Sequence, residues 1–260
     1  MLKLCANLSM LYTEVPFLER FKQAAADGFR GVEYLFPYAY PASEILQRLQ
    51  DQQLQQVLFN LPAGNWDEGD RGIACDPKRV SEFRAGVERA LEYATVLNCQ
   101  QCNALAGIAP AGLRSTALRK TFVDNLHYAA DLMQQSGVKL LIEAINTRDI
   151  PGFYLNKSEQ AISILDEVGS DNLFYQYDIY HMQVMEGDLA NTIQKYLDRI
   201  GHMQLADNPG RHEPGSGEIN YHFLFQHLQQ IGYQGWIGCE YRPLTTTAAG
   251  IGWLQDYAQI

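Results

Sequence analysis

Four apolar segments in the second half of the chain each end in an oxygen-bearing side chain, which a buried strand rarely carries without a role. They are VKLLIEAI with Glu143, LFYQYDIY with Asp178, GHMQLAD with Gln204 and GWIGCEY with Glu240. Successive members lie roughly one strand, one helix and two loops apart. If the strands are parallel and close into a barrel, the four side chains meet at one face, where polar residues are typically catalytic.

Three carboxylates at one centre repel one another, and a divalent cation relieves that repulsion. All four proposed ligands, Glu143, Asp178, Gln204 and Glu240, offer oxygen, which favours Mg²⁺ or Mn²⁺ over zinc. Glu143 and Glu240 would face each other across this centre from the fifth and eighth strands. Such a pair can remove a proton from one carbon and return it to the neighbouring carbon.

Each of these residues also has a plainer interpretation. Glu143 could be a loop acid just beyond its strand, and Asp178 could cap a helix while His181 is simply hydrogen-bonded. We favour Asp178 as a ligand and His181 as a substrate contact. Gln204 could be a hydrogen-bonded core amide, and His202 lies two positions earlier on the same strand face, one layer deeper. Gln204 is preferred over His202 because it lies nearer the strand end.

Apolar strands alternate with amphipathic helices along the whole chain, which is the pattern of a parallel sheet built from βα units. Strands are predicted at about 2–8, 31–35, 55–60, 101–105, 138–143, 173–178, 200–206 and 235–240. Helices are predicted at about 16–27, 41–53, 77–97, 115–136, 158–168, 188–198, 221–231 and 246–258. Eight strands and eight helices predict a (β/α)8 TIM barrel, an α/β fold.

Local signals support several boundaries. Asp27-Gly28 and Ser136-Gly137 are typical helix ends, and Asn220 is placed to cap the helix that follows it. The longest loops, about 61–76 and 205–220, leave the carboxyl ends of strands and should carry the site. An open doubly wound sheet is the alternative fold, but no G-x-G-x-x-G follows the first strand.

Composition describes one ordinary globular domain over residues 1–260, with 47% hydrophobic and 19% charged residues. The net charge of -10 argues against nucleic acid as a partner, because binding phosphates needs clustered Lys and Arg. No apolar run approaches the roughly 18 residues of a membrane helix, and no signal-type segment begins the chain. We therefore expect a cytoplasmic protein with no membrane partner and an unknown oligomeric state.

The five cysteines are odd in number and scattered, which suits a reducing compartment. Cys99 and Cys102 form a C-x-x-C, but no second Cys or His pair lies nearby to complete a zinc site. Buried free thiols are the better interpretation.

Several segments together resemble a known family. NWDEGDRGIACDP, IEAINTRDIPGFYL, YDIYHMQ and QLADNPGRHEPGSGEINY are similar to signature segments of the hydroxypyruvate isomerase family, within the xylose-isomerase-like barrels. The resemblance spans essentially the whole chain and is strongest to the branch that interconverts 2-dehydro- and 3-dehydro-tetronate. It implies a metal-dependent barrel with Glu143, Asp178, Gln204 and Glu240 as metal ligands, and with Glu143 and Glu240 as proton donor and acceptor. The chain departs from the related epimerases at Gln204, where those enzymes usually carry His.

A 2-oxo acid substrate carries a carboxylate, which needs local positive charge in an acidic protein. Arg71, Arg211 and Arg148, in that order of preference, lie in loops at the expected catalytic face, although each alone could brace a loop. Tyr177 and Tyr180 are candidate pocket residues. The loop PGRHEPGSGE lacks the Gly-Lys-Ser ending of a phosphate-binding loop and is better explained as a shaped loop.

The leading hypothesis is an isomerase that moves a carbonyl between adjacent carbons of a small hydroxylated 2-oxo acid through an enediolate. A four-carbon 2-oxo-tetronate is preferred over hydroxypyruvate as the substrate. A ketose 3-epimerase is the next alternative, followed by a non-catalytic barrel that binds sugar acids. An abasic-site endonuclease is disfavoured, because six His and a charge of -10 do not suit several zinc ions on a basic face.

Overall fold

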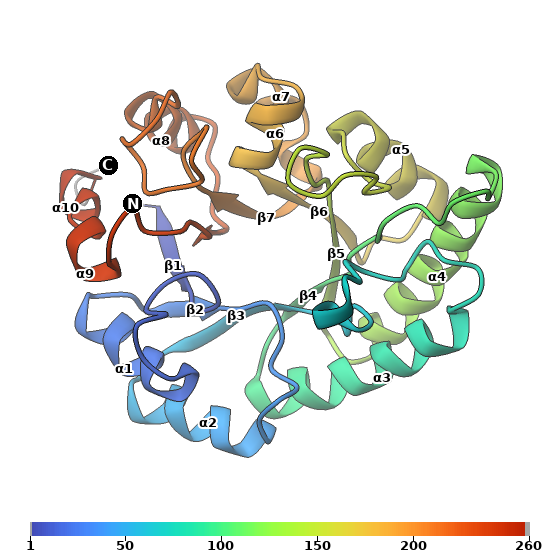
Figure 1. Cartoon of the computed structure of the whole chain (residues 1–260), viewed down its shortest axis with the longest axis horizontal. Coiled ribbons are helices and arrows are strands. Elements are labelled where there is room, and N and C mark those ends of the chain that lie inside the picture. The colour runs from blue at the N-terminus through green and yellow to red at the C-terminus, as the bar shows by residue number, and fades with distance from the viewer. Residues whose placement is uncertain (1, 258–260) are drawn as a thin grey trace.

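The computed structural model describes residues 2–257, in which eight parallel strands close into a barrel surrounded by helices (Figure 1). Each strand pairs with the next along the chain, and β1 closes the barrel by pairing with β8. The strands are β1 Lys3–Asn7, β2 Gly31–Glu33, β3 Gln55–Asn60, β4 Gln101–Asn103, β5 Lys139–Glu143, β6 Leu173–Asp178, β7 Ile200–Leu205 and β8 Trp236–Cys239. The predicted (β/α)8 fold is confirmed, with most strands a residue or two shorter than expected.

Helices follow the strands and form the outer ring (Figure 1). The helices of the first five units are α1 Phe17–Ala26, α2 Ala42–Asp51, α3 Val80–Leu97, α4 Ser115–Gln135 and α5 Ser158–Val168. The later ones are α6 Ile179–Met185, α7 Leu189–Lys195, α8 Tyr221–Gln230, α9 Thr247–Gly250 and α10 Trp253–Tyr257, with short 3₁₀ turns at Trp66–Glu68 and Leu197–Arg199.

Two helical predictions were wrong in detail. The expected helix 188–198 is α7 followed by a 3₁₀ turn, and the expected helix 246–258 is divided into α9 and α10 by a turn at Ile251 and Gly252, with residue 258 outside the described part. Helix α6, which begins directly after β6, was not predicted. Its seven residues are too few to show helical periodicity, and its N-cap is Asp178, whose side chain accepts a hydrogen bond from the His181 amide at 3.0 Å.

Local chemistry explains other boundaries. Asn220 caps α8 as predicted, accepting from the amide of Phe223 at 3.0 Å. Gly169 ends α5 with φ of 65°, a backbone conformation that favours glycine. In α2 the apolar stripe consists of Ile45 and Leu49, one turn apart and both buried against the barrel.

The inside of the barrel carries an unusual number of polar side chains for a fold whose interior is typically packed with branched apolar residues. Those with at most 4% of their surface exposed include Asn7, Glu33, Asn60, Asn103, Gln176, His202 and Gln204. They are joined by hydrogen bonds beneath the carboxyl ends of the strands. The five cysteines are buried free thiols, as expected for Cys99 and Cys102. None of the helices between residues 2 and 257 is long and apolar enough to cross a membrane.

Candidate active site

The four predicted strand-end residues all lie at the carboxyl face of the barrel. Glu143 is the last residue of β5 and Asp178 the last of β6, while Glu240 directly follows β8. Gln204 is the penultimate residue of β7 and pairs with Asp178 on one side and Gly238 on the other. Because Glu240 comes two residues after Gly238, it lies higher in the barrel than Gln204.

The side chains of Glu143, Asp178 and Glu240 are almost completely buried, and their negative charges repel one another. Burial, followed by the charges of Glu240 and Asp178, raises the pKa of Glu143 well above its usual value. Burial also raises the pKa of Glu240 to about 8, although the neighbouring Arg211 acts in the opposite direction. Asp178 is 0% exposed, and its Oδ2 atom accepts no hydrogen bond from the described residues. Such a cluster holds excess negative charge that a cation would stabilise.

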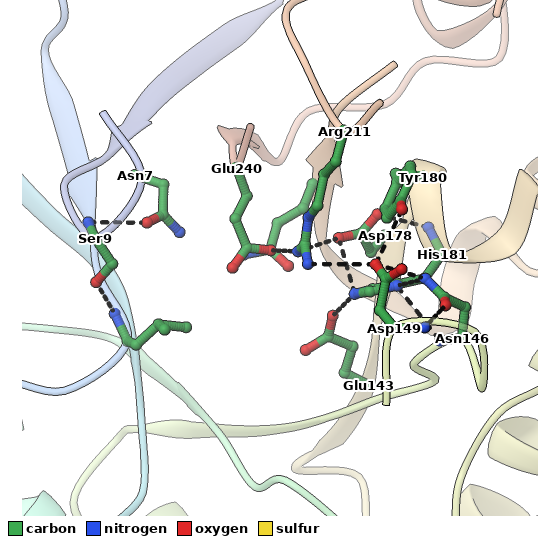
Figure 2. Close-up of polar contacts among 12 residues, drawn as sticks. Asn7, Ser9, Glu143, Asn146, Asp149, Asp178, Tyr180, His181, Arg211 and Glu240 are labelled. Atoms are coloured by element: carbon green, nitrogen blue, oxygen red, sulfur yellow. Dashed lines mark hydrogen bonds and ion pairs between the residues drawn. The ribbon is translucent and has the colours of Figure 1, made fainter. Parts of the chain in front are cut away.

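Arg211 extends from the loop after β7 into the middle of these acids, as Figure 2 shows. Its Nη2 atom lies 3.1 Å from Oε2 of Glu240 and 3.8 Å from Oδ2 of Asp178, and Nη1 lies 3.9 Å from Oδ2 of Asp149. The side chain is 15% exposed. The guanidinium also lies over the ring of Tyr180. Arg211 is therefore the positive charge closest to the proposed catalytic carboxylates among the described residues.

His181 faces the same centre from α6. The amide nitrogen of the Asn146 side chain lies 2.6 Å from Nδ1, which makes Nδ1 the acceptor and places the ring proton on Nε2. Nε2 lies 3.7 Å from Asp178 Oδ2 and 3.9 Å from Glu143 Oε1. Burial lowers the pKa of His181 to about 4, so the ring is neutral near pH 7 and presents an N–H to the centre.

A divalent cation fits this set of side chains. Side-chain atoms of Glu143, Asp178 and His181 lie within 4.8 Å of one another, and Oδ2 of Asp178 accepts no hydrogen bond from the described residues. Because Nε2 of His181 carries a proton and Nδ1 accepts from Asn146, the carboxylates are the available ligands in this cluster. Gln204 lies lower, 2% exposed, and its Oε1 atom accepts from Nε2 of Gln176 at 2.7 Å. An amide oxygen has two lone pairs, so this bond leaves one for a cation.

A cavity of about 500 Å³ opens above these residues. Its walls include predicted residues, namely Glu143, His181, Arg71, Arg211, Glu240 and Tyr180. They also include residues that were not predicted from the sequence, among them Asn60, Trp66, Asp149 and Arg242. Trp66 and Asp149 lie within the family-like segments, so those segments were a usable signal. Asn60 and Arg242 end or follow strands, as the predicted site residues do.

Tyr177 was wrongly expected to line the pocket. It is 0% exposed on β6, where its ring packs edge-to-face on Tyr175 at a centroid distance of 5.7 Å. Side chains alternate across a strand, so Gln176 and Asp178 face the barrel interior while Tyr175 and Tyr177 face the helices. Tyr180 does line the cavity, because it lies on α6 rather than on the strand.

The three candidate arginines occupy different places. Arg71 lines the cavity, stacks over Trp66 at 4.4 Å and donates to the carbonyl oxygens of Trp66 and Asp70. Arg148 is 49% exposed and bridges the Tyr180 hydroxyl and the Asn208 side chain, outside the cavity lining. The geometry favours Arg211 over Arg71 as a substrate contact, and makes Arg148 a rim residue.

The glycine-rich loop that carries Arg211 is organised by a buried acid. The Asp207 side chain accepts hydrogen bonds from the amides of Asn208, Gly215, Gly217 and Ile219 at 2.9 to 3.0 Å. These amides are thus engaged within the loop, which supports a shaped loop rather than a phosphate cradle.

Comparison with known proteins places the chain in a family. A family model described as a xylose isomerase-like TIM barrel matches residues 21–257. The hydroxypyruvate isomerase of Escherichia coli strain K12 is 52% identical over 257 residues, covering 99% of this chain and 100% of that protein. The 2-oxo-tetronate isomerase of Cupriavidus necator is 48% identical over 255 residues, covering 98% of each.

Solved structures agree on the fold. A crystal structure described as an AP endonuclease of family 2 from Brucella melitensis superposes with a TM-score of 0.97 at 44% identity, covering 99% of each chain. A 3-keto-D-glucoside 4-epimerase from Escherichia coli superposes at 0.79 with 20% identity, which supports the barrel fold alone. The chain therefore belongs to the hydroxypyruvate isomerase family of isomerases, within the xylose isomerase-like TIM barrels.

Proposed function

We propose that this protein is a cation-dependent isomerase of small hydroxylated 2-oxo acids, which interconverts 2-dehydro-tetronate and 3-dehydro-tetronate. The observation that carries the proposal is the pair of buried glutamates, Glu143 and Glu240, that line one cavity and both have a raised pKa. A bound cation would favour the ionised form of these two carboxylates. The ionised form is the one that can take up a proton from carbon and return it. The names of the relatives support the same class of reaction.

The chemistry follows from what these side chains can do. One glutamate takes the proton from C3 of the 2-oxo acid, so that a C2–C3 double bond forms and one negative charge develops on the C2 oxygen, beside the C3 hydroxyl oxygen. The neutral His181 can donate its Nε2 proton as a hydrogen bond to one of these oxygens. Return of a proton to C2 and transfer of the C3 hydroxyl proton to the C2 oxygen leave the carbonyl at C3. The same glutamate or the opposite one returns the carbon-bound proton.

Glu143, Asp178, Gln204 and Glu240 would hold Mg²⁺ or Mn²⁺ at the floor of the cavity. When bound, the cation supplies positive charge that stabilises the two adjacent substrate oxygens. The donor set supports this assignment, because hard divalent cations prefer oxygen ligands and Oδ2 of Asp178 accepts no hydrogen bond from the described residues.

The carboxylate of the substrate would be bound by arginine. Arg211 is the best placed because it lines the cavity beside Glu240, and Arg71 and Arg242 add positive charge to the lining of the same cavity. Arginine presents paired N–H groups that match a carboxylate. A cavity of about 500 Å³ has room for a four-carbon chain.

Two other activities are less well supported. A ketose 3-epimerase would have less use for several arginines at the cavity wall. A nuclease, which the name of the Brucella relative suggests, would need a basic face, whereas this chain carries a net charge of -10. The possible cation cluster around Glu143 and Asp178 contains a single histidine, which also disfavours a site for several zinc ions.

The test monitors, by NMR in deuterated water, whether the carbon-bound proton of the substrate exchanges with solvent. The protein is incubated with Mn²⁺ or Mg²⁺ and with 2-oxo-tetronate, hydroxypyruvate or a ketose. Isomerised 2-oxo acid with deuterium at the new C–H position is the expected result, and Glu143→Gln and Glu240→Gln should each slow its formation by about 10²- to 10⁴-fold. Cation binding without turnover of any of these compounds would instead support a binding protein, and turnover of the ketose alone would support an epimerase.

A further inference from the structure

A fully buried glutamate that the proposed reaction does not use lies directly beneath the site. Glu33, the last residue of β2, is 0% exposed and accepts four hydrogen bonds. Its Oε1 atom accepts from Nδ2 of Asn7 at 2.9 Å and from Nε2 of Gln204 at 2.7 Å. Its Oε2 atom accepts from Nε2 of His202 at 2.7 Å and from Sγ of Cys5 at 3.4 Å. These bonds occupy the four lone-pair positions of a carboxylate, so Glu33 has none left for a ligand of its own.

The hydrogen bond from Gln204 decides which way its amide faces. A carboxylate only accepts, so the amide nitrogen of Gln204 must face Glu33 and its oxygen must face the opposite side. That oxygen accepts from Nε2 of Gln176, which also donates to Oε2 of Glu143 at 3.0 Å. The Gln204 oxygen and the Glu143 carboxylate are thus held by one amide group, and Glu143 lines the cavity.

We propose that Glu33 is a positioning residue, which turns the carbonyl oxygen of Gln204 toward the catalytic cation and increases the negative charge on that oxygen. This proposal rests on the cation site proposed above. A carboxylate that accepts from the far side of a ligand fixes its orientation and makes it a stronger donor of electrons. Without that acceptor, the amide of Gln204 could rotate and present N–H groups to the cation.

The rest of the network fits a carboxylate at this position. Nε2 of Gln101 lies 3.3 Å from Nδ1 of His202, so Nδ1 accepts and the Nε2 proton is directed to Glu33. Gly238 on β8 provides the space, because a Cβ atom at this position would clash with both oxygens of Glu33. Gly238 is also the residue that pairs with Gln204 across β7 and β8.

The experiment measures Mn²⁺ affinity by calorimetry and by electron paramagnetic resonance, independently of activity. Glu33→Gln keeps the shape of the side chain but replaces an acceptor by a donor, and should weaken Mn²⁺ binding by about 10- to 100-fold. The control is Gln56→Met, a buried substitution on β3 whose hydrogen bond goes to the carbonyl oxygen of Leu58, outside this network. Its Mn²⁺ affinity should equal that of the unsubstituted chain. If Glu33→Gln does not fold, Glu33→Asp is measured in its place. The shorter side chain keeps the negative charge but moves it away from Gln204, so Mn²⁺ binding should again weaken.

A double-mutant cycle shows whether Glu33 acts through Gln204. In the Gln204→Met background, Glu33→Gln should cause no further loss of Mn²⁺ affinity, because the group that Glu33 orients is gone. If Glu33→Gln lowers the Mn²⁺ affinity by the same factor with and without Gln204→Met, the proposal is overturned. Glu33 would then act on the cation through its charge and not through Gln204. Unchanged affinity in Glu33→Gln would also overturn the proposal. If the unsubstituted chain binds no Mn²⁺, the cation site itself fails, which is a separate and recognisable outcome that removes this inference with it.

Discussion

The Nη2 atom of Arg211 lies 3.1 Å from Oε2 of Glu240, so the proposed substrate clamp and a proposed catalytic base are direct neighbours (Figure 2). The guanidinium offsets part of the negative charge that Glu143, Asp178 and Glu240 share. It therefore stands close to the place that a divalent cation would occupy, and the two positive charges repel each other. Arg211 should help substrate binding and oppose cation binding at the same time.

We expect Arg211→Met to have opposite effects on the two ligands. The Kd for Mn²⁺ should stay the same or decrease, because a neighbouring positive charge is removed, while kcat/KM for the 2-oxo acid falls at least tenfold because its carboxylate loses a charge-assisted partner. Calorimetry and steady-state kinetics measure the two effects. The matched control is Arg148→Met, which removes an exposed rim arginine and should change both values little. Parallel losses of cation and substrate affinity in Arg211→Met would contradict this view of the site.

Glu143→Gln and Glu240→Gln should each lower kcat by about 10²- to 10⁴-fold, the usual effect of removing a positioned acid or base. The cation-free protein should nevertheless be at least as stable as the unsubstituted chain, because each change removes one of several mutually repelling carboxylates. Urea unfolding in the presence of a chelator measures stability, and NMR measures turnover. A variant that lost activity only because it unfolded would show a lowered unfolding midpoint, and retained turnover would contradict the catalytic assignment.

Without a cation, stability should fall as the pH rises from about 5 to 8. Burial raises the pKa of Glu240 in the folded protein from 4.5 to about 8, so between these values the folded state keeps a proton that the unfolded state has released. Folding then becomes less favourable with increasing pH. The decline should be smaller in Glu240→Gln, and Mn²⁺ should counteract it most strongly at pH 8, where the carboxylate is ionised. Identical pH profiles for Glu240→Gln and the unsubstituted chain would contradict the raised pKa.

The sequence was sufficient to predict the barrel and the placement of most candidate site residues at one face, because strand ends recur at regular spacing and the fold collects them there. It missed α6, since seven residues directly after a strand show no helical period, although Asp178 carried the capping signal. It also ranked Arg71 above Arg211. The backbone path of a long loop decides how far each arginine reaches inward, and Arg211 adopts a φ of 56° that local sequence patterns did not reveal.

The role of Glu33 was hidden for a different reason. The segment GVEYLF places a glutamate near the end of a short strand, as in the four segments that were recognised, but Glu33 lies one layer deeper and reaches partners on β1 and β7. Contacts between residues separated by 169 positions depend on the register of the closed barrel. Spacing along the chain predicts which strands carry polar residues, whereas register decides which of those residues meet.

The space left by Gly238 gives a last prediction, which tests the packing around Glu33 without changing any polar group. Gly238→Ala adds a methyl group where the Glu33 carboxylate lies, and should destabilise the protein by about 1–3 kcal/mol while weakening Mn²⁺ binding. Gly252→Ala is the control, because nothing lies within 4 Å of its added Cβ. Combining Gly238→Ala with Glu33→Asp should cost less stability than the sum of the two single changes, since the shorter acid makes room for the methyl group. Strict additivity in urea unfolding would show that the two residues do not share this space.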